Sequence, residues 1–461
     1  MDAVNNKPLT ECSFIIMGGT GDLSKRKLIP AIYNLIAQQQ LTTFSVLLVA
    51  FSATSAAEIL EQARPFISAL DPIIWEKLCA ATYYHQMDFY NEVCYPLLQS
   101  SLIDIEKKHE LKGNRIFYLA TMPQHFETIT KFFAHHGIVS NDPGCHLAGQ
   151  EPWARVVYEK PFGYDLASAK ALNKSITRAF CERCVFRIDH YLGKELVGNI
   201  ALTRFTNRIF EPLWNHKHIE SVHITLSETL GVEGRGAFYD TSGALKDNVQ
   251  SHMLQILALV AMEAPAYLSA EYIRAAKAAV LKRVVVENVT LGQYDGYLQE
   301  KNVDPRSTTE TYAALCLKIK NRRWQGVPFY VTTGKKLDKK ETSVVITFKP
   351  AKCLLNICPV TTNTLTINIA PNEGLFLDLH IKTPGTNNHV QPISMEFCHS
   401  CLFGPNTPQA YEVLLVDVIN GDQSAFLRAD EIELAWKIIA QAQTFITPLQ
   451  TYAPGSTGPK S

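Results

Sequence analysis

A glycine-rich loop near the start of the chain restricts the folds that the first part of the protein can adopt. The loop Gly18-Gly19-Thr20-Gly21 follows the apolar run 14–17 and precedes a helical pattern over 23–38. Glycines allow a tight turn, and a helix that starts behind them offers unpaired N–H groups to a pyrophosphate. The order strand, loop and helix therefore predicts a dinucleotide-binding unit, although the spacing G-x-x-G is a variant of the usual fingerprint.

Further apolar runs in the first third of the chain support this interpretation. They cover residues 44–51, 115–120 and 154–158 and are separated by helical patterns. Continuous apolar runs of this length are typical of parallel strands that are covered on both faces. We therefore expect an α/β Rossmann-type dinucleotide-binding domain over residues 1–189, with its ligand at the carboxyl ends of the strands.

The pattern changes after about residue 190. Apolar and polar residues alternate over 221–227, 312–320, 343–348 and 365–369. Such alternation is typical of an antiparallel sheet with one covered face. Two long helical patterns cover residues 244–263 and 430–443. Residues 190–461 are therefore predicted to form an α+β domain with a large, mainly antiparallel sheet.

Charge and hydropathy limit the partners that we expect. The chain has 44 Lys and Arg residues and 44 Asp and Glu residues, so its formal net charge is zero. Proteins that bind nucleic acid or membrane surfaces usually carry a basic excess, so we expect neither as a partner. No apolar run approaches the roughly 18–20 residues of a membrane span, and residues 1–12 lack the apolar core of a signal peptide. We expect a cytoplasmic protein.

The 11 cysteines are scattered along the chain, which favours reduced thiols over a disulfide framework. Cys181-x-x-Cys184 and Cys398-x-x-Cys401 are the two closely spaced pairs. A structural zinc site usually keeps its pairs about 12–20 residues apart, whereas more than two hundred residues separate these. We therefore expect packed free thiols and no metal.

The loop after the second apolar run should distinguish the two nicotinamide cofactors. An acidic residue there binds the ribose 2′-hydroxyl of NAD, and an Arg receives the 2′-phosphate of NADP. Residues 49–55 contain neither, and the hydroxyls of Ser52 and Thr54 suit both cofactors. The residues therefore predict a nicotinamide dinucleotide without deciding its kind.

Several ionisable residues follow predicted strands. Lys160 lies in the segment 159–163 at a strand end, where a side chain enters the ligand crevice. If the segment 187–195 is helical from Asp189, then His190 and Lys194 share a face that suits a phosphate monoester, but a solvated charged face explains the segment equally well.

Two further segments allow both a functional and a structural interpretation. His252 borders the apolar stripe of the pattern 244–263, so it is either a satisfied core histidine or a general base near neutral pH. The four lysines of 334–340 form either a solvated turn or an anion clamp. Spacing alone does not separate these alternatives.

Taken together, these segments resemble the glucose-6-phosphate dehydrogenase family. The resemblance runs from about residue 12 to the tail and rests on the segments 17–25, 159–163, 187–195, 207–215, 326–330, 333–335 and 430–436. The segment Arg187-Ile188-Asp189-His190-Tyr191-Leu192-Gly193-Lys194-Glu195 is highly specific. Glu159-Lys160-Pro161 is less so, because other sugar oxidoreductases carry it.

The resemblance implies roles for individual residues. His252 is the base that removes the proton of the C1 hydroxyl, and Asp189 is the carboxylate that orients it. The substrate phosphate is bound by His190, Tyr191 and Lys194.

The remaining substrate and cofactor contacts are also implied by the resemblance. Lys160 bridges sugar and cofactor, Glu228 and Asp247 hold sugar hydroxyls, and Lys335 and Lys340 are basic substrate contacts. The cofactor-binding residues are Gly18, Thr20, Gly21, Asp22, Leu23 and Lys160.

The implied reaction is oxidation of glucose 6-phosphate at C1 to 6-phosphogluconolactone with hydride transfer to NADP, the first step of the oxidative pentose phosphate pathway. The implied assembly is a homodimer or homotetramer formed through the large sheet.

Two features depart from a simple transfer of these roles. Ala53 stands about where the family usually has the Arg that receives the 2′-phosphate, so NAD is an alternative cofactor. Asp247 precedes His252 by five residues, so on one ideal α-helix the two side chains would point apart. The alternatives to the leading function are an NAD-preferring or different sugar-phosphate dehydrogenase, and a catalytically silent regulatory relative.

Overall fold

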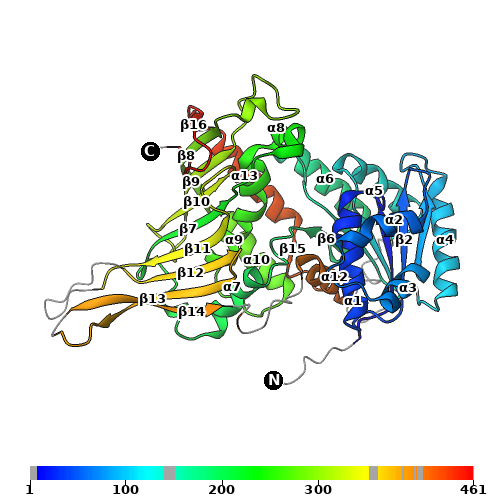
Figure 1. Ribbon diagram of the computed structural model, residues 1–461, viewed down its shortest axis with the longest axis horizontal. Helices are drawn as coiled ribbons and strands as arrows, with labels where there is room; N and C mark the ends of the chain where they lie inside the picture. Colours follow the sequence, from blue (N-terminus) through cyan, green and yellow to red (C-terminus); the bar gives the residue numbers. More distant parts are fainter. Residues whose placement is uncertain are drawn as a thin grey trace. The chain divides into compact units, whose positions relative to one another are not determined.

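The chain forms two compact units (Figure 1). The computed structural model describes residues 8–139, 151–351, 362–386, 389–398, 401 and 409–459. The first unit consists of residues 1–193 and 408–429, and the second of residues 194–407 and 430–461. The sequence analysis assigned all of 190–461 to the second domain, so it did not anticipate that 408–429 joins the first.

A seven-stranded sheet forms the centre of the first unit. Its strands are β1 (Cys12–Met17), β2 (Phe44–Ala50), β3 (Thr82–Gln86), β4 (Arg115–Leu119), β5 (Ala154–Tyr158), β6 (Val185–Ile188) and β15 (Phe426–Leu427). Their order is β15-β6-β5-β4-β1-β2-β3, and β1 to β6 are parallel. This is the order of the dinucleotide-binding fold, in which the ligand lies beyond the carboxyl ends of the strands. The predicted Rossmann-type fold is confirmed.

Helices between the strands complete the first unit. They are the π-helix η1 (Ser24–Leu28), α1 (Ile29–Ala37), α2 (Ala56–Ala63), α3 (Pro72–Ala80), α4 (Cys94–Lys108), α5 (Phe126–His135), α6 (Leu166–Ala179) and α12 (Ala410–Asn420). Every residue of β1 and β2 is buried, as expected for parallel strands that are covered on both faces.

Residues 408–429 complete one edge of this sheet. Strand β15 pairs antiparallel with β6, and Phe426 is fully buried. The guanidinium of Arg155 in β5 donates to the carbonyl oxygen of Ile419 at 2.6 Å, and the side-chain amide of Gln423 donates to the carbonyl oxygen of Val185 at 2.8 Å. The returning segment is therefore joined to the sheet by both main-chain and side-chain hydrogen bonds.

A nine-stranded sheet forms the second unit. Its strands are β7 (Ile219–Ser227), β8 (Val284–Tyr294), β9 (Tyr312–Ile319), β10 (Pro328–Gly334), β11 (Glu341–Phe348), β12 (Thr364–Ala370), β13 (Gly374–Lys382), β14 (Val390–Cys398) and β16 (Gln450–Tyr452). The order is β14-β13-β12-β11-β7-β10-β9-β8-β16. Only the pairs β7–β10 and β8–β16 are parallel, so the predicted large, mainly antiparallel sheet is confirmed.

The second unit also contains helices. They are α7 (Glu195–Thr206), α8 (Gly236–Ala244), the π-helix η8 (Leu245–Met253), α9 (Leu254–Ala261), α10 (Ala270–Leu281) and α13 (Ala429–Ala442). Helix α7 contacts β12, and η8 contacts both β7 and β10. The contacts of η8 matter for function, because η8 carries two of the predicted site residues.

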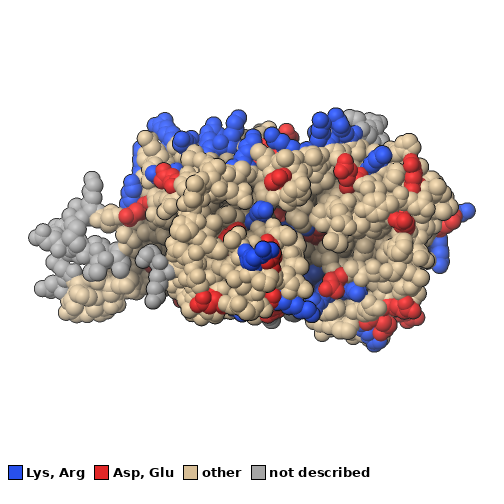
Figure 2. Space-filling model, turned by 90° about the horizontal axis from the view of Figure 1, so that it is seen from above, with Lys and Arg blue, Asp and Glu red and all other residues tan. Residues whose placement is uncertain are grey.

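The surface carries charges of both signs. In the view of Figure 2, Lys and Arg side chains gather along one border, and Asp and Glu side chains are scattered over the rest of the face. The zero net charge of the chain thus combines a basic border with scattered acidic side chains. None of the helices that the structure describes is both long enough and apolar enough to span a bilayer.

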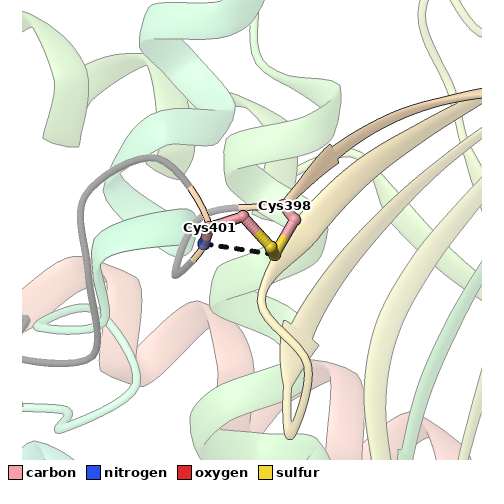
Figure 3. The surroundings of a disulfide bond; sticks show 2 residues. All are labelled: Cys398 and Cys401. Carbon is pink, nitrogen blue, oxygen red and sulfur yellow. Dashed lines mark hydrogen bonds between the residues drawn. A yellow bond between two sulfur atoms is a disulfide. The ribbon is translucent and has the colours of Figure 1, made fainter.

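One cysteine pair differs from its expected state. Cys398, at the end of β14, forms a disulfide with Cys401 (Figure 3). The backbone N–H of Cys401 also donates to Sγ of Cys398 at 3.3 Å. The prediction of packed free thiols is therefore wrong for this pair, which the close spacing of the two residues brings together. Cys181 and Cys184 are reduced thiols.

Candidate functional site

The glycine loop connects β1 to the first helix at the carboxyl edge of the parallel sheet. Gly18 has a positive φ of 94°, and a Cβ on Gly18 would lie 2.6 Å from the carbonyl oxygen of Ala120 after β4. A Cβ on Gly19 would lie 2.8 Å from the Cβ of Leu48 in β2. Both positions therefore require glycine, because the loop passes close to the two neighbouring strands.

The start of the helix is left open for a ligand. Helical residues begin at Asp22, and half-buried Thr20 and Gly21 precede it. The N–H groups of Thr20 and Asp22 donate to no backbone oxygen of the described residues. Such groups at a helix N-terminus are suited to bind phosphate oxygens. The predicted cofactor residues Gly18, Thr20, Gly21, Asp22 and Leu23 thus lie where the fold places a pyrophosphate, and they fit that group.

The loop after β2 is open to solvent. The side chain of Phe51 is 71% exposed, Ala53 is also exposed, and Thr54 donates its hydroxyl to Oε2 of Glu58 at 2.5 Å. Tyr84 of β3 donates its hydroxyl to a carbonyl of this loop. The loop therefore carries no side-chain charge at the position where the family usually has an Arg.

Three cations near this region are candidates to replace that Arg. Lys25 donates from Nζ to Oε1 of Gln62 at 3.2 Å, and the guanidinium of Arg26 lies 4.9 Å from the ring centre of Phe66. Arg64 forms an exposed ion pair with Glu61 at 3.3 Å. Lys25 and Arg26 follow the glycine loop directly, so they are the cations nearest to it in sequence.

Lys160 follows β5 at the same carboxyl edge of the sheet. It is half-buried, and its neighbour Glu159 is buried and accepts hydrogen bonds from the hydroxyls of Tyr118 at 2.5 Å and Tyr411 at 3.3 Å. Burial raises the pKa of Glu159 to about 7, although the two tyrosines and the charge of Lys160 lower it. The strand end thus combines a cation with a carboxyl group that titrates near neutral pH.

The segment after β6 forms a turn. Asp189 is 1% exposed and accepts a hydrogen bond from the backbone N–H of Tyr191 at 3.0 Å, and the rings of His190 and Tyr191 lie 5.0 Å apart. Residues 190–193 are turn, and α7 begins only at Glu195. The condition of a helix from Asp189 is therefore not met, and the i,i+4 relation between His190 and Lys194 that depended on it does not hold.

These residues nevertheless gather on the first unit's ligand edge. The glycine loop follows β1, Lys160 follows β5, and Asp189 follows β6, all at carboxyl ends of parallel strands. Lys194 is the N-cap residue of α7 and begins the second unit.

Two further predicted residues meet in the second unit. Glu228 follows β7 and Lys335 follows β10, and these strands run parallel, with Ser227 beside Gly334. The carboxyl ends of the two strands therefore coincide. Nζ of Lys335 forms an ion pair with the carboxylate of Glu228, and the backbone N–H of Glu228 donates to the carbonyl oxygen of Gly334 at 2.9 Å, which holds the two ends together.

The helix that carries His252 is not a uniform α-helix. Residues 245–253 form the π-helix η8, in which hydrogen bonds join residues five apart. Asp247 and His252 are five apart, so a π-helix brings them close to one face, where an α-helix would turn them away from each other. The side chain of Asn248 donates to the hydroxyl of Thr333 in β10 at 3.0 Å, and this bond fixes η8 over the strand ends. His252 is 2% exposed.

The last predicted substrate residue, Lys340, lies in the turn between β10 and β11 and is exposed. Its neighbour Lys339 forms an ion pair with Glu341, and the carbonyl of Lys339 accepts from Ser227 at 2.8 Å. The turn thus combines an ion pair at Lys339 with an exposed cation at Lys340, in keeping with either the solvated turn or the anion clamp.

Sequence reasoning missed three tyrosines near these residues. Tyr118 and Tyr411 contact Glu159, and Tyr411 lies on α12, which the sequence assigned to the other domain. Tyr239 on α8 is 3% exposed, and its ring centre lies 5.0 Å from Nζ of Lys335. No spacing rule links a tyrosine on a returning helix to a strand end, so the sequence offered no signal for Tyr411. For Tyr239, the apolar residues around it in the sequence gave only a weak signal.

Comparisons with known proteins agree over nearly the whole chain. The family model described as "Glucose-6-phosphate dehydrogenase, NAD binding domain" matches residues 15–199, and that described as "Glucose-6-phosphate dehydrogenase, C-terminal domain" matches residues 201–461.

Individual relatives give the same result. Glucose-6-phosphate 1-dehydrogenase of Chlamydia pneumoniae is 40% identical over 99% of this chain and 94% of its own length, and that of Bacillus subtilis is 40% identical over 97% and 94%. A solved structure of glucose-6-phosphate dehydrogenase in complex with its substrate glucose-6-phosphate superposes with a TM-score of 0.91 at 32% identity, covering 98% of this chain and 96% of that one. The protein therefore belongs to the glucose-6-phosphate dehydrogenase family and is an oxidoreductase that acts on a CH–OH group.

Proposed function

We propose that the protein oxidises glucose 6-phosphate at C1 to 6-phosphogluconolactone, with hydride transfer to NADP, as in the first step of the oxidative pentose phosphate pathway. The observation that carries the proposal is the arrangement in the second unit. Buried His252 lies on a π-helix fixed over the two strand ends that carry Glu228 and Lys335. The similarity to a structure of the dehydrogenase with glucose-6-phosphate supports the substrate.

His252 acts as the general base that takes the proton of the C1 hydroxyl. A buried imidazole is suited to this step, because histidine can accept a proton at neutral pH and the alcohol must lose its proton as the hydride leaves. Asp189 orients the imidazole, a role that rests on the family resemblance of the segment 187–195. The bound nicotinamide supplies the hydride acceptor.

The other predicted residues bind and orient the sugar phosphate. His190, Tyr191 and Lys194 supply charge-assisted hydrogen bonds to the phosphate. The sugar is held by a further set of residues, with Lys160 also contacting the cofactor: Lys160, Glu228, Asp247, Lys335 and Lys340.

NADP is the cofactor that we propose, held at its pyrophosphate by the glycine loop. The open loop at Ala53 lacks the usual Arg, so a cation such as Lys25, Arg26 or Arg64 takes over the contact with the 2′-phosphate. If none does, the enzyme prefers NAD, because losing one charge-assisted hydrogen bond costs about 1.5–3 kcal/mol.

We further propose a cytoplasmic homodimer or homotetramer that forms through the large sheet. Tyr330 on β10 supports the interface, because its side chain is 38% exposed on the face of the sheet opposite to buried Phe329. Light scattering during gel filtration tests this assembly, and a monomer at micromolar concentration would contradict it.

The deciding experiment follows the absorbance of reduced cofactor for purified protein with glucose 6-phosphate. NADP and NAD are run side by side, with unphosphorylated glucose as the control. Strong reduction of NADP supports the proposal, and preference for NAD changes only its cofactor. No reduction of either by folded protein would favour another sugar phosphate or a catalytically silent relative.

The phosphate contacts are tested separately with Lys194→Ala. We expect KM for glucose 6-phosphate to rise about ten- to a hundredfold, because a charge-assisted hydrogen bond to phosphate is lost, while the residual rate with unphosphorylated glucose stays the same. An unchanged KM for glucose 6-phosphate would remove Lys194 from the phosphate site.

A further inference from the structure

Two adjacent histidines and a glutamate meet on the first unit, at the end of α5 and just before α4. His135 is the last residue of α5, His136 follows it, and Glu92 lies two residues before α4 begins. Nε2 of His135 and Nε2 of His136 each lie 3.4 Å from the same carboxylate oxygen, Oε1 of Glu92. All three atoms lie within 4.8 Å of one another.

These distances agree with the coordination shell of a transition metal ion. Zinc binds imidazole nitrogen at about 2.0–2.1 Å and carboxylate oxygen at about 2.0–2.2 Å, so neighbouring ligand atoms of a tetrahedral site lie about 3.3 Å apart. The two distances of 3.4 Å to Glu92 match that separation. A small inward movement of the two rings would complete three corners of a tetrahedron.

The surroundings hold one of the rings in this orientation. The ring of His136 stacks on Tyr95, with ring centres 6.2 Å apart and planes inclined by 8°. Tyr95 is fully buried and donates its hydroxyl to the carbonyl oxygen of Phe89 at 2.8 Å. Nε2 of His136 is buried and has no hydrogen-bond partner among the described residues, although Oε1 of Glu92 lies 3.4 Å away. A buried nitrogen of this kind is suited to donate its lone pair to a metal ion.

Access from solvent also favours an ion over a simple ion pair. His135 and Glu92 are exposed, so an ion can enter from solvent and keep water as its remaining ligand. Lys131, one helical turn before His135 on α5, carries a positive charge and would repel a metal ion. Its repulsion would weaken binding without blocking the ligand atoms.

We propose that Glu92, His135 and His136 bind one divalent transition metal ion of the class that prefers imidazole, with Zn²⁺ as its representative. The bound ion would join the start of α4 to the end of α5, two elements that otherwise meet mainly through the aromatic contacts of Tyr95 with Phe132 and Phe133. Its role would be to stabilise the first unit, separate from the oxidation chemistry.

The test uses full-length protein without an affinity tag, stripped with chelator and then titrated with Zn²⁺ at about pH 7.5, where metal-binding histidines can release their protons. We expect one equivalent to bind with a micromolar Kd and to raise the melting temperature. Co²⁺ in place of Zn²⁺ should give the intense visible bands of a tetrahedral site.

Variants separate this site from unspecific binding. Glu92→Gln and His135→Gln change exposed side chains, so both should fold normally and weaken binding at least about tenfold. His136→Gln should weaken binding in the same way. The matched control is His109→Gln, because His109 lies in the same unit and forms a hydrogen bond with the hydroxyl of Tyr83. Binding only above about 0.1 mM, or equal binding by Glu92→Gln and unaltered protein, would overturn the proposal.

Discussion

The carboxylate of Glu228 and the ammonium of Lys335 form an ion pair between the ends of two parallel strands. Glu228 is 39% exposed and Lys335 only 12%, so the pair lies at the border between solvent and protein. The ring of Tyr239 covers the ammonium from the protein side. Each charge is thus neutralised by the other, and the ion pair fixes the geometry of both groups.

Lys335→Ala tests whether this pair contacts substrate. We expect KM for glucose 6-phosphate to rise about ten- to a hundredfold, because one charge-assisted contact is lost and Glu228 is left unpaired. Lys339→Ala, in the following turn, is the control, since Lys339 already pairs with Glu341. Equal KM values for the two variants would mean that the Glu228–Lys335 pair is only structural.

His252→Asn tests the general base. Asn keeps the approximate size of the side chain but cannot accept a proton, so we expect kcat to fall about 10²–10⁴-fold with KM largely kept. His223→Asn is the matched control, because His223 lies on β7 and stacks against Tyr330, with ring centres 4.6 Å apart. Near-normal turnover of His252→Asn would exclude the residue from proton transfer.

Ala53→Arg tests the origin of cofactor preference. Arg at this exposed position restores the usual partner of the 2′-phosphate, so the ratio of kcat/KM for NADP over NAD should rise about tenfold or more. Ala57→Arg places the same charge on an exposed position of α2 and should leave the ratio nearly constant. A ratio that Ala53→Arg does not change would show that the 2′-phosphate lies elsewhere.

Glu159→Gln tests the raised pKa of the buried carboxyl group. Burial raises the pKa from 4.5 to about 7 in the folded protein, so the folded state binds a proton that the unfolded state has released between these pH values. The protonated carboxyl group of Glu159 therefore contributes to the free energy of unfolding below about pH 4.5. This contribution, on the order of 3 kcal/mol, is lost as pH rises through about 7.

The readout is the denaturant midpoint of both proteins between about pH 5 and pH 8. Unaltered protein should lose stability over this range relative to Glu159→Gln, because Gln has no proton to lose. Parallel curves for the two proteins would show that Glu159 does not titrate in this range.

The sequence predicted the elements whose pattern is local. The apolar runs at 14–17, 44–51, 115–120 and 154–158 became β1, β2, β4 and β5, because continuous burial leaves a continuous apolar signature. Strand β3 was missed because its sequence Thr82-Tyr83-Tyr84-His85-Gln86 is polar and mostly half-buried, as suits a sheet edge.

Features that depend on distant pairing or on helix geometry were beyond the sequence pattern. Nothing local indicates that β7 and β10 run parallel, so the contact between Glu228 and Lys335 could not be derived. A π-helix and an α-helix share the same apolar spacing over a few residues, which is why the five-residue step from Asp247 to His252 looked unfavourable. The roles of these residues were therefore predicted from the resemblance of whole segments to a known family.

Synthesis on the ribosome gives the returning strand β15 a further consequence. The sheet of the first unit is complete only when Phe426 and Leu427 pair with β6, more than two hundred residues after that strand. At about 5–20 residues per second, the nascent chain exposes the edge of β6 for on the order of 10–50 s. During that interval the growing polypeptide presents an unpaired strand edge to other nascent chains and to chaperones. Only the synthesis of residues 426 and 427 removes this site of possible intermolecular pairing.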